Sequence, residues 1–127
     1  MMSRQKWFAC LLALLLAVGL AVPALARYSY VDYSTSDLSI SGSTATVKGY
    51  VRMTAAGESI EMTTSLLLDG KEIDSWSTPT SEGSNWARIT KSVRLRESGE
   101  YQVVTDYTVY GPGGSESGTS YSGTETY

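Results

Sequence analysis

One segment of this chain alternates between small or apolar side chains and polar or phenolic ones: Thr44-Ala45-Thr46-Val47-Lys48-Gly49-Tyr50-Val51-Arg52-Met53. Successive side chains of a β-strand point to opposite faces of the sheet, so a period of two places Val47 and Val51 on one face and Lys48 and Arg52 on the other. The segment is therefore predicted to be a strand with one buried face and one face in water.

The same alternation recurs along the chain, and turn residues separate its repeats. We expect further strands over residues 38–40, 59–68, 71–77, 86–95, 101–110 and 119–127. The pair Asp69-Gly70 between two of these ranges is a strong signal for a two-residue hairpin turn. The short, polar range 71–77 is typical of an edge strand. The run Gly111-Pro112-Gly113-Gly114 is expected to open a flexible loop.

About seven short strands with regular turn signals, and no apolar stripe at helical spacing, predict an all-β fold. The expected architecture over residues 27–127 is a single antiparallel immunoglobulin-like (Ig-like) β-sandwich with Greek-key connections. Near its end, Glu97-Ser98-Gly99-Glu100-Tyr101-Gln102-Val103 resembles the tyrosine corner of the immunoglobulin fold. The resemblance implies structural roles for Tyr101, Val103 and Gly99. Antibody domains also carry a Cys pair and a Trp on the third strand, which this chain lacks, so the expectation is a generic Ig-like domain.

The first 26 residues have the composition of an export signal. Arg4 and Lys6 precede an uncharged apolar run, and Pro23 precedes the small residues Ala24 and Ala26, at the positions that a signal peptidase reads. A helical signal peptide over residues 1–26, with cleavage after Ala26, is the predicted outcome. The run is also long enough to span a bilayer, so a retained membrane anchor is the alternative. Cys10 would leave with the peptide.

The mature chain also resembles small secreted proteins of Gram-positive gut bacteria, which have an export signal followed by one Ser/Thr-rich β domain. The resemblance rests on the ending Tyr121-Ser122-Gly123-Thr124-Glu125-Thr126-Tyr127 and on the strand that begins at Thr44. This group of proteins is functionally uncharacterised. The resemblance therefore implies a β-sandwich fold and a secreted, extracellular location, without an activity.

The composition excludes most kinds of catalytic or cofactor site. The chain has no His, and its single Cys is in the leader, so neither a disulfide nor a Cys-based metal site is expected in the mature domain. Serine nucleophiles would have to pair with Lys, and no Ser-x-x-Lys segment occurs in the predicted mature domain, residues 27–127. The acidic side chains fall in loops or on outward-facing positions, as solvated carboxylates do; examples are Asp32, Asp37, Glu61, Asp74 and Glu116. We expect no enzyme activity, no catalytic residue, no cofactor and no metal.

Partners are constrained by charge. The formal net charge of −3 becomes more negative when Arg4 and Lys6 are removed. An acidic domain lacks the Lys/Arg clusters that nucleic acids and anionic membranes attract, so neither is an expected partner after cleavage. An extracellular glycan or protein remains as the partner class.

Aromatic side chains on polar faces are the candidate ligand contacts. Trp86 alternates with Arg88, and Trp76 with Asp74, so both indoles could form a platform for sugar rings or for an apolar patch of another protein. Tyr50 and Tyr110 complete the candidate set. The alternative is that both Trp residues cover the ends of the hydrophobic core.

Lys91 falls on the apolar side of its expected strand, between Ile89 and Val93. A buried ammonium without a partner would cost several kcal/mol. It therefore reaches solvent at a sheet edge, is reset outward by a β-bulge, or has formed an isopeptide bond with a neighbour such as Asp106 or Glu125.

The sequence thus predicts a secreted, non-enzymatic Ig-like domain that binds or supports something outside the cell. A carbohydrate-binding module that uses exposed Trp and Tyr is one alternative, and a secreted antimicrobial or toxin-like protein is the other.

Overall fold

The structure, a computed structural model, describes residues 30–78 and 85–127. The expected signal peptide over residues 1–26, with Ala24 and Ala26, lies outside the described residues. The regular structure in the described ranges consists of eight strands: β1 (Val31–Ser41), β2 (Thr44–Met53), β3 (Ser59–Leu68), β4 (Lys71–Thr78), β5 (Trp86–Arg94), β6 (Glu100–Gly111), β7 (Gly114–Tyr121) and β8 (Glu125–Thr126). Within these two ranges, no helix has the length and apolar character needed to cross a bilayer.

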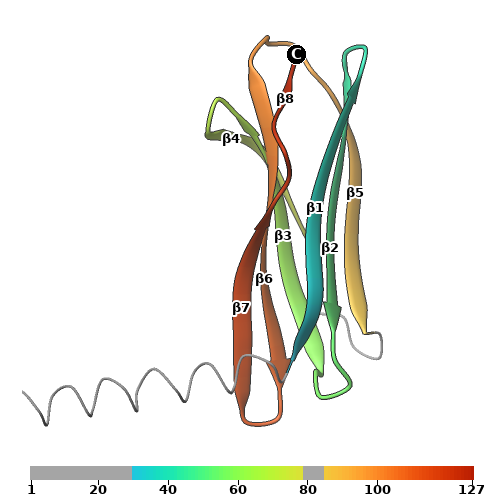
Figure 1. Cartoon of the computed structure of the whole chain (residues 1–127), viewed down its shortest axis with the longest axis vertical. Helices are drawn as coiled ribbons and strands as arrows, with labels where there is room; N and C mark the ends of the chain where they lie inside the picture. Colours follow the sequence, from blue (N-terminus) through green and yellow to red (C-terminus); the bar gives the residue numbers. More distant parts are fainter. Residues whose placement is uncertain (1–29, 79–84) are drawn as a thin grey trace, which may run out of the picture.

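The strands form two antiparallel sheets that face each other (Figure 1). One sheet has the order β1-β2-β5, and the other has the order β4-β3-β6-β7, with β8 paired to the start of β6. In immunoglobulin nomenclature, β1, β2 and β5 correspond to strands A, B and E, and β4, β3, β6 and β7 correspond to strands C′, C, F and G. The fourth strand, β4, therefore belongs to the same sheet as β3, as strand C′ does in variable-type domains. The predicted fold class, an all-β, antiparallel Ig-like sandwich, is confirmed.

The regions with clear alternation lie where the sequence predicts them. Strands β2 and β3 have the expected bounds, and the turn between β3 and β4 has Asp69 and Gly70 at φ angles of 49° and 83°. Positive φ at both central residues is the requirement of a type I′ hairpin, which matches the twist of the flanking strands. Strand β4 is an edge of its sheet, as predicted.

The first strand is much longer than the expected range 38–40, because β1 begins at Val31 and pairs with β2 along its length. The inward-facing positions of β1 are not consistently apolar, so the sequence shows little of the alternation by which a strand is predicted. Ser36 is buried there, and its hydroxyl lies 2.7 Å from Thr105 Oγ1 and 2.9 Å from the Ser120 carbonyl oxygen. A serine that hydrogen-bonds across the two sheets takes a position where the pattern would require an aliphatic residue.

The expectation of a flexible loop at residues 111–114 is wrong. Gly111 and Gly114 are paired, and Pro112-Gly113 forms a tight turn with Gly113 at a φ of 92°. Proline fixes the first central position of such a turn, and glycine accepts the positive φ of the second. The closing strand therefore starts at Gly114, earlier than the predicted residue 119.

The predicted closing strand over residues 119–127 is interrupted at Ser122, between β7 and β8. The Ser122 hydroxyl accepts a hydrogen bond from the Val103 N–H, and the Ser122 N–H donates to the Val103 carbonyl oxygen. A side chain thus satisfies a backbone donor of β6 at the point where the strand ladder is broken.

Two hydrophobic clusters fill the space between the sheets, with a layer of hydroxyl groups between them. One cluster contains Val51 and Ile60, and the other contains Val47 and Leu66. Between them on β3 and β6, Thr64 and Thr105 are fully buried, and their hydroxyl oxygens are 3.1 Å apart. Each hydroxyl has a partner, so the layer avoids the cost of unpaired buried polar groups.

Tyr101 closes the end of the second cluster. Its ring is buried, and its hydroxyl donates to the backbone carbonyl oxygen of Glu97, four residues upstream. This is the hydrogen bond by which a tyrosine corner is recognised. A side chain at Gly99 would bring its Cβ to within 2.6 Å of Leu68 Cδ1, and Val103, two residues after Tyr101, is fully buried.

Candidate functional site on the outer face of β1-β2-β5

Three aromatic residues lie on the outer face of the three-stranded sheet, one on each strand: Tyr33 on β1, Tyr50 on β2 and Trp86 on β5. The strand register sets their positions. Arg52 lies opposite both Tyr33 and Trp86, and Tyr50 belongs to the next row, where Arg88 lies opposite it. The three rings therefore form a shallow V, with Tyr33 and Trp86 at the same level on the two outer strands and Tyr50 one row away on the middle strand. We call them the aromatic row.

The rings of the aromatic row contact one another and are open to solvent. The Tyr33 and Tyr50 centroids are 5.5 Å apart with planes inclined at 58°, and those of Tyr50 and Trp86 are 6.3 Å apart at 23°. Such separations are typical of favourable aromatic pairs. Tyr33 and Trp86 nevertheless keep 50% and 46% of their surface exposed, so about half of each residue is open to solvent.

Arg88 is held against two of these rings. Its guanidinium carbon lies 5.6 Å from the Tyr50 centroid and 5.4 Å from the Trp86 centroid, within the range of cation–π attraction. The ion pair that the structure places within residues 30–78 and 85–127 joins Arg52 to Asp32 at 3.6 Å and does not involve Arg88. The rings thus orient the Arg88 side chain, while its N–H groups have no carboxylate partner among the described residues.

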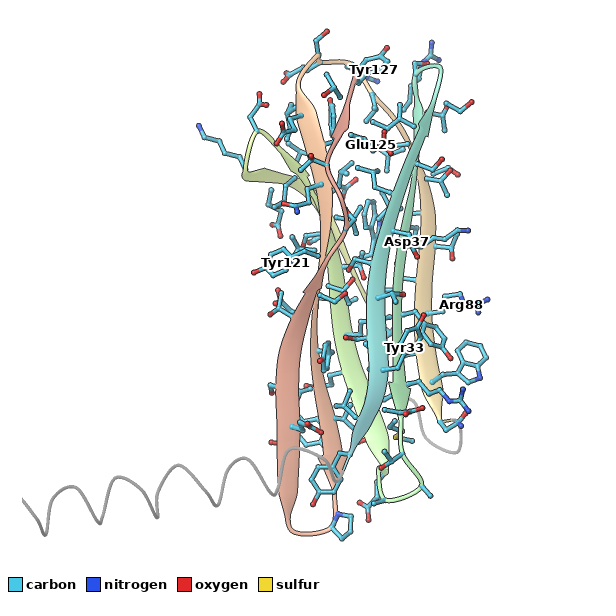
Figure 2. All side chains as sticks on the ribbon, in the orientation of Figure 1. Tyr33, Asp37, Arg88, Tyr121, Glu125 and Tyr127 are labelled. Atoms are coloured by element: carbon cyan, nitrogen blue, oxygen red, sulfur yellow. The ribbon has the colours of Figure 1, made fainter. Side chains whose placement is uncertain are left out.

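A shallow open depression of about 570 Å³ lies beside the aromatic row. Its lining comes from all three strands: Tyr33, Thr35, Asp37, Lys48, Gly49, Tyr50, Arg88 and Thr90. Figure 2 shows the labelled side chains of Tyr33, Asp37 and Arg88 on this layer. The depression presents aromatic, hydroxyl and charged groups on strands, which are more rigid supports than loops.

Charge is divided between the two sheets. The β1-β2-β5 sheet carries five cationic side chains, all on β2 and β5, and two acidic ones, Asp32 and Asp37 on β1: the cations are Lys48, Arg52, Arg88, Lys91 and Arg94. The strands of the other sheet carry one cationic side chain, Lys71, and seven acidic ones: Glu61, Glu72, Asp74, Glu100, Asp106, Glu116 and Glu125. The aromatic row therefore lies on the cationic layer of a chain whose net charge is −3.

The structure brings together two of the four predicted ligand contacts, Tyr50 and Trp86. Trp76 is half-buried and packs against both hydrophobic clusters, so the core-covering alternative holds for this residue. A β-bulge at Leu66/Leu67 resets the pairing of β4 and places Trp76 opposite the buried Thr64. Tyr110 lies on β6 in the other sheet and does not contribute to the aromatic row.

Sequence reasoning missed Tyr33 and the position of Arg88. Tyr33 alternates with Thr35 and Asp37, and this polar alternation is the signal that could have extended the first strand. Arg88 is on the predicted outward face of β5, beside Trp86. Its contact with Tyr50 depends on the register between β2 and β5, which the sequence does not specify.

The outer face of the second sheet has a groove of a different kind, with a volume of about 440 Å³ between β3, β6 and β7. The carboxylates that line it already accept hydrogen bonds: Asp106 Oδ1 from Thr119 Oγ1 of the same groove at 2.7 Å, and Glu61 Oε2 from the hydroxyl of Tyr110, outside the groove, at 2.8 Å. The hydrogen bond to Glu61 raises the pKa of Tyr110 above its ordinary value. Because these carboxylates already have partners, the groove offers a ligand fewer free groups than the aromatic row does.

Among the residues that the structure describes, no three carboxylate-bearing side chains converge. Lys91 lies opposite the buried Val47, on the inward side of β5, yet its side chain is exposed. β5 is an edge strand, so the side chain reaches solvent past the end of the sheet.

No protein-family model and no curated protein matches the chain. Among solved structures, the chain is similar to the CARDB domain of a protein from Pyrococcus furiosus, crystallised in complex with di-metal ions. The two share 12% sequence identity and a TM-score of 0.42, and the match covers 74% of this chain and 94% of the other. A likeness at this level assigns no ligand or activity, and the fold assignment depends on the strand order described above.

Proposed function

We propose that this protein is a non-enzymatic binding domain that works outside the cell and holds a saccharide on the outer face of β1-β2-β5. The observation that carries the proposal is the aromatic row, in which Tyr33, Tyr50 and Trp86 contact one another while both end rings remain about half exposed. The export signal expected over residues 1–26 supports an extracellular location.

The aromatic row suits sugars because the C–H faces of a pyranose ring are apolar, whereas its rim carries hydroxyl groups. The exposed surfaces of Tyr33 and Trp86 provide the apolar contact, and Thr35, Asp37 and Thr90 line the adjacent depression with hydrogen-bonding groups. Three neighbouring strands span roughly 10 Å, so the surface fits more than one sugar unit of a chain. A wide, shallow surface of this kind favours an extended ligand over a small enclosed one.

The proposal is tested by measuring the binding of the purified protein to a glycan array and then, by calorimetry, to the oligosaccharides that give a signal. Trp86→Ala should weaken binding about tenfold, equivalent to ~1.4 kcal/mol. Tyr121→Ala is the matched control, because Tyr121 is 65% exposed but lies on β7 in the other sheet. Equal affinities for wild type and Trp86→Ala, or the absence of binding to any glycan, would contradict the proposal.

A further inference from the structure

We infer that the saccharide is acidic, with carboxylate or sulfate groups along its chain, and that Arg88 selects for it. The inference rests on the proposed function, since it assigns the chemical class of the ligand that the aromatic row binds. It starts from a cation that is fixed in place and has no anionic partner among the described residues.

The position of Arg88 leaves its hydrogen-bond donors available. The guanidinium carbon lies over the Tyr50 and Trp86 rings, 5.6 Å and 5.4 Å from their centroids, and the N–H groups make no ion pair with a carboxylate of the described residues. A guanidinium carries five N–H donors in its plane, and these match the oxygen atoms of a carboxylate or sulfate. Because the rings restrict the side chain in advance, less conformational entropy is lost when an anion binds.

The same contacts argue against a cationic ligand. Aromatic clusters bind quaternary ammonium groups through their ring faces. Here the protein's own guanidinium occupies the space near Tyr50 and Trp86, and a second cation would meet both steric and electrostatic repulsion. The arrangement therefore presents a positive group over an aromatic support, which is the reverse of a cation cage.

Nearby charges reinforce this selectivity. Lys48 and Arg88 both line the depression, where Asp37 is the single carboxylate among the lining residues. The carboxylate of Asp32, at the edge of the row, is paired with Arg52. Across the three strands of this sheet, five cationic side chains outnumber the two carboxylates of Asp32 and Asp37, so the local potential attracts anions although the whole chain is acidic.

The test compares three probes at equal chain length: an oligogalacturonide for carboxylate, a sulfated chondroitin oligosaccharide for sulfate, and a neutral cello-oligosaccharide. Wild-type protein should bind at least one acidic probe about tenfold more tightly than the neutral one in 20 mM salt. This advantage should shrink in 500 mM salt, because salt screens exposed charges. The preferred acidic probe identifies the anion.

Two substitutions separate the role of Arg88 from general charge. Arg88→Gln should remove the preference, so that the same variant binds the acidic and the neutral probe with affinities that agree within about twofold. Arg88→Lys keeps the charge without the planar fork and should retain only part of the preference. Arg94→Gln is the control, since Arg94 is on the same strand but does not line the depression.

The failures of the two proposals are distinguishable. If the neutral probe binds as tightly as the acidic ones, or if Arg94→Gln reduces the preference as much as Arg88→Gln, the inference is overturned and the saccharide site stands. If neither these probes nor any glycan of the array binds, the proposed function itself is overturned. Binding to vesicles that contain phosphatidylserine, in the absence of saccharide binding, would identify the face as a lipid-binding surface and overturn both.

Discussion

The hydroxyl group of Thr64 fills the space into which a side chain at Gly49 would project. A Cβ at Gly49 would overlap Thr64 Oγ1 and lie 2.7 Å from Thr105 Oγ1. Gly49 on β2 therefore lets the two sheets approach closely at the hydroxyl layer, where Thr64 and Thr105 are fully buried.

Gly49→Ala should destabilise the fold by about 3 kcal/mol, because overpacking a well-filled core forces side chains or backbone to shift. Urea unfolding followed by circular dichroism measures this change. Thr64→Ala in the Gly49→Ala background should recover part of the loss, since it removes the overlapping hydroxyl. Gly123→Ala is the control, because a Cβ there meets no atom within 4 Å. Equal stabilities of the Gly49→Ala and Gly123→Ala variants would disprove the close approach.

Tyr101→Phe should lower the free energy of unfolding by about 1 kcal/mol, because it removes the hydrogen bond from the phenol to the Glu97 carbonyl and keeps the ring. Thermal and urea unfolding both report this change. Tyr121→Phe, on an exposed ring, should leave stability unchanged. If Tyr101→Phe melts at the wild-type temperature, the tyrosine corner does not stabilise this domain.

Stability should fall at alkaline pH, and Tyr101 should be one cause. Burial and the nearby carboxylate of Glu97 raise the pKa of Tyr101 above its ordinary value of 10.0. Between pH 10.0 and the raised pKa of Tyr101 in the folded state, the folded protein keeps a proton that the unfolded chain has lost, so rising pH favours unfolding. The stabilisation is complete below about pH 10 and is lost as the pH passes through the folded-state pKa.

The measurement is urea unfolding from pH 8 to pH 12. Because the pKa of Tyr110 is also raised, the comparison uses Tyr110→Phe with and without Tyr101→Phe. The double variant should lose less stability between pH 10 and pH 12. Identical losses would show that the pKa of Tyr101 is the same in the folded and the unfolded state, which contradicts the shift.

Lys91→Val should promote self-association. An inward-facing charge on an edge strand is a device that discourages pairing with another sheet, and Lys91 has this position on β5. Light scattering at increasing protein concentration should show dimers or aggregates for Lys91→Val. Ser92→Val, at the next and outward-facing position, should remain like wild type. Monomeric Lys91→Val at every concentration would refute this role.

Much of the fold could be predicted because alternation and turn chemistry are local properties. The Val47 and Val51 alternation gave the bounds of β2, and Asp69-Gly70 gave the hairpin between β3 and β4. The full length of the first strand was not predicted, because Ser36 is buried through a hydrogen bond to a hydroxyl group on the other sheet. Its burial depends on a residue 69 positions away, Thr105, which no local pattern contains.

The candidate site was half predictable for the same reason. The alternation of side chains along β5 places Trp86 on the outer face, but only the register between β5 and β2 brings it near Tyr50. Trp76 has the same kind of polar neighbours in sequence, and the bulge at Leu66/Leu67 turns it toward the core. The overall acidic charge pointed away from anionic partners, because a sum over the chain hides the separation of charge between the sheets.

That separation gives the molecule an electric dipole moment directed from one layer to the other. A negatively charged material at low ionic strength will therefore rotate the approaching protein until the Lys- and Arg-bearing layer leads. Retention on a cation-exchange column should exceed what a net charge of −3 suggests. Captured molecules would then all present the same carboxylate-bearing layer to the solution.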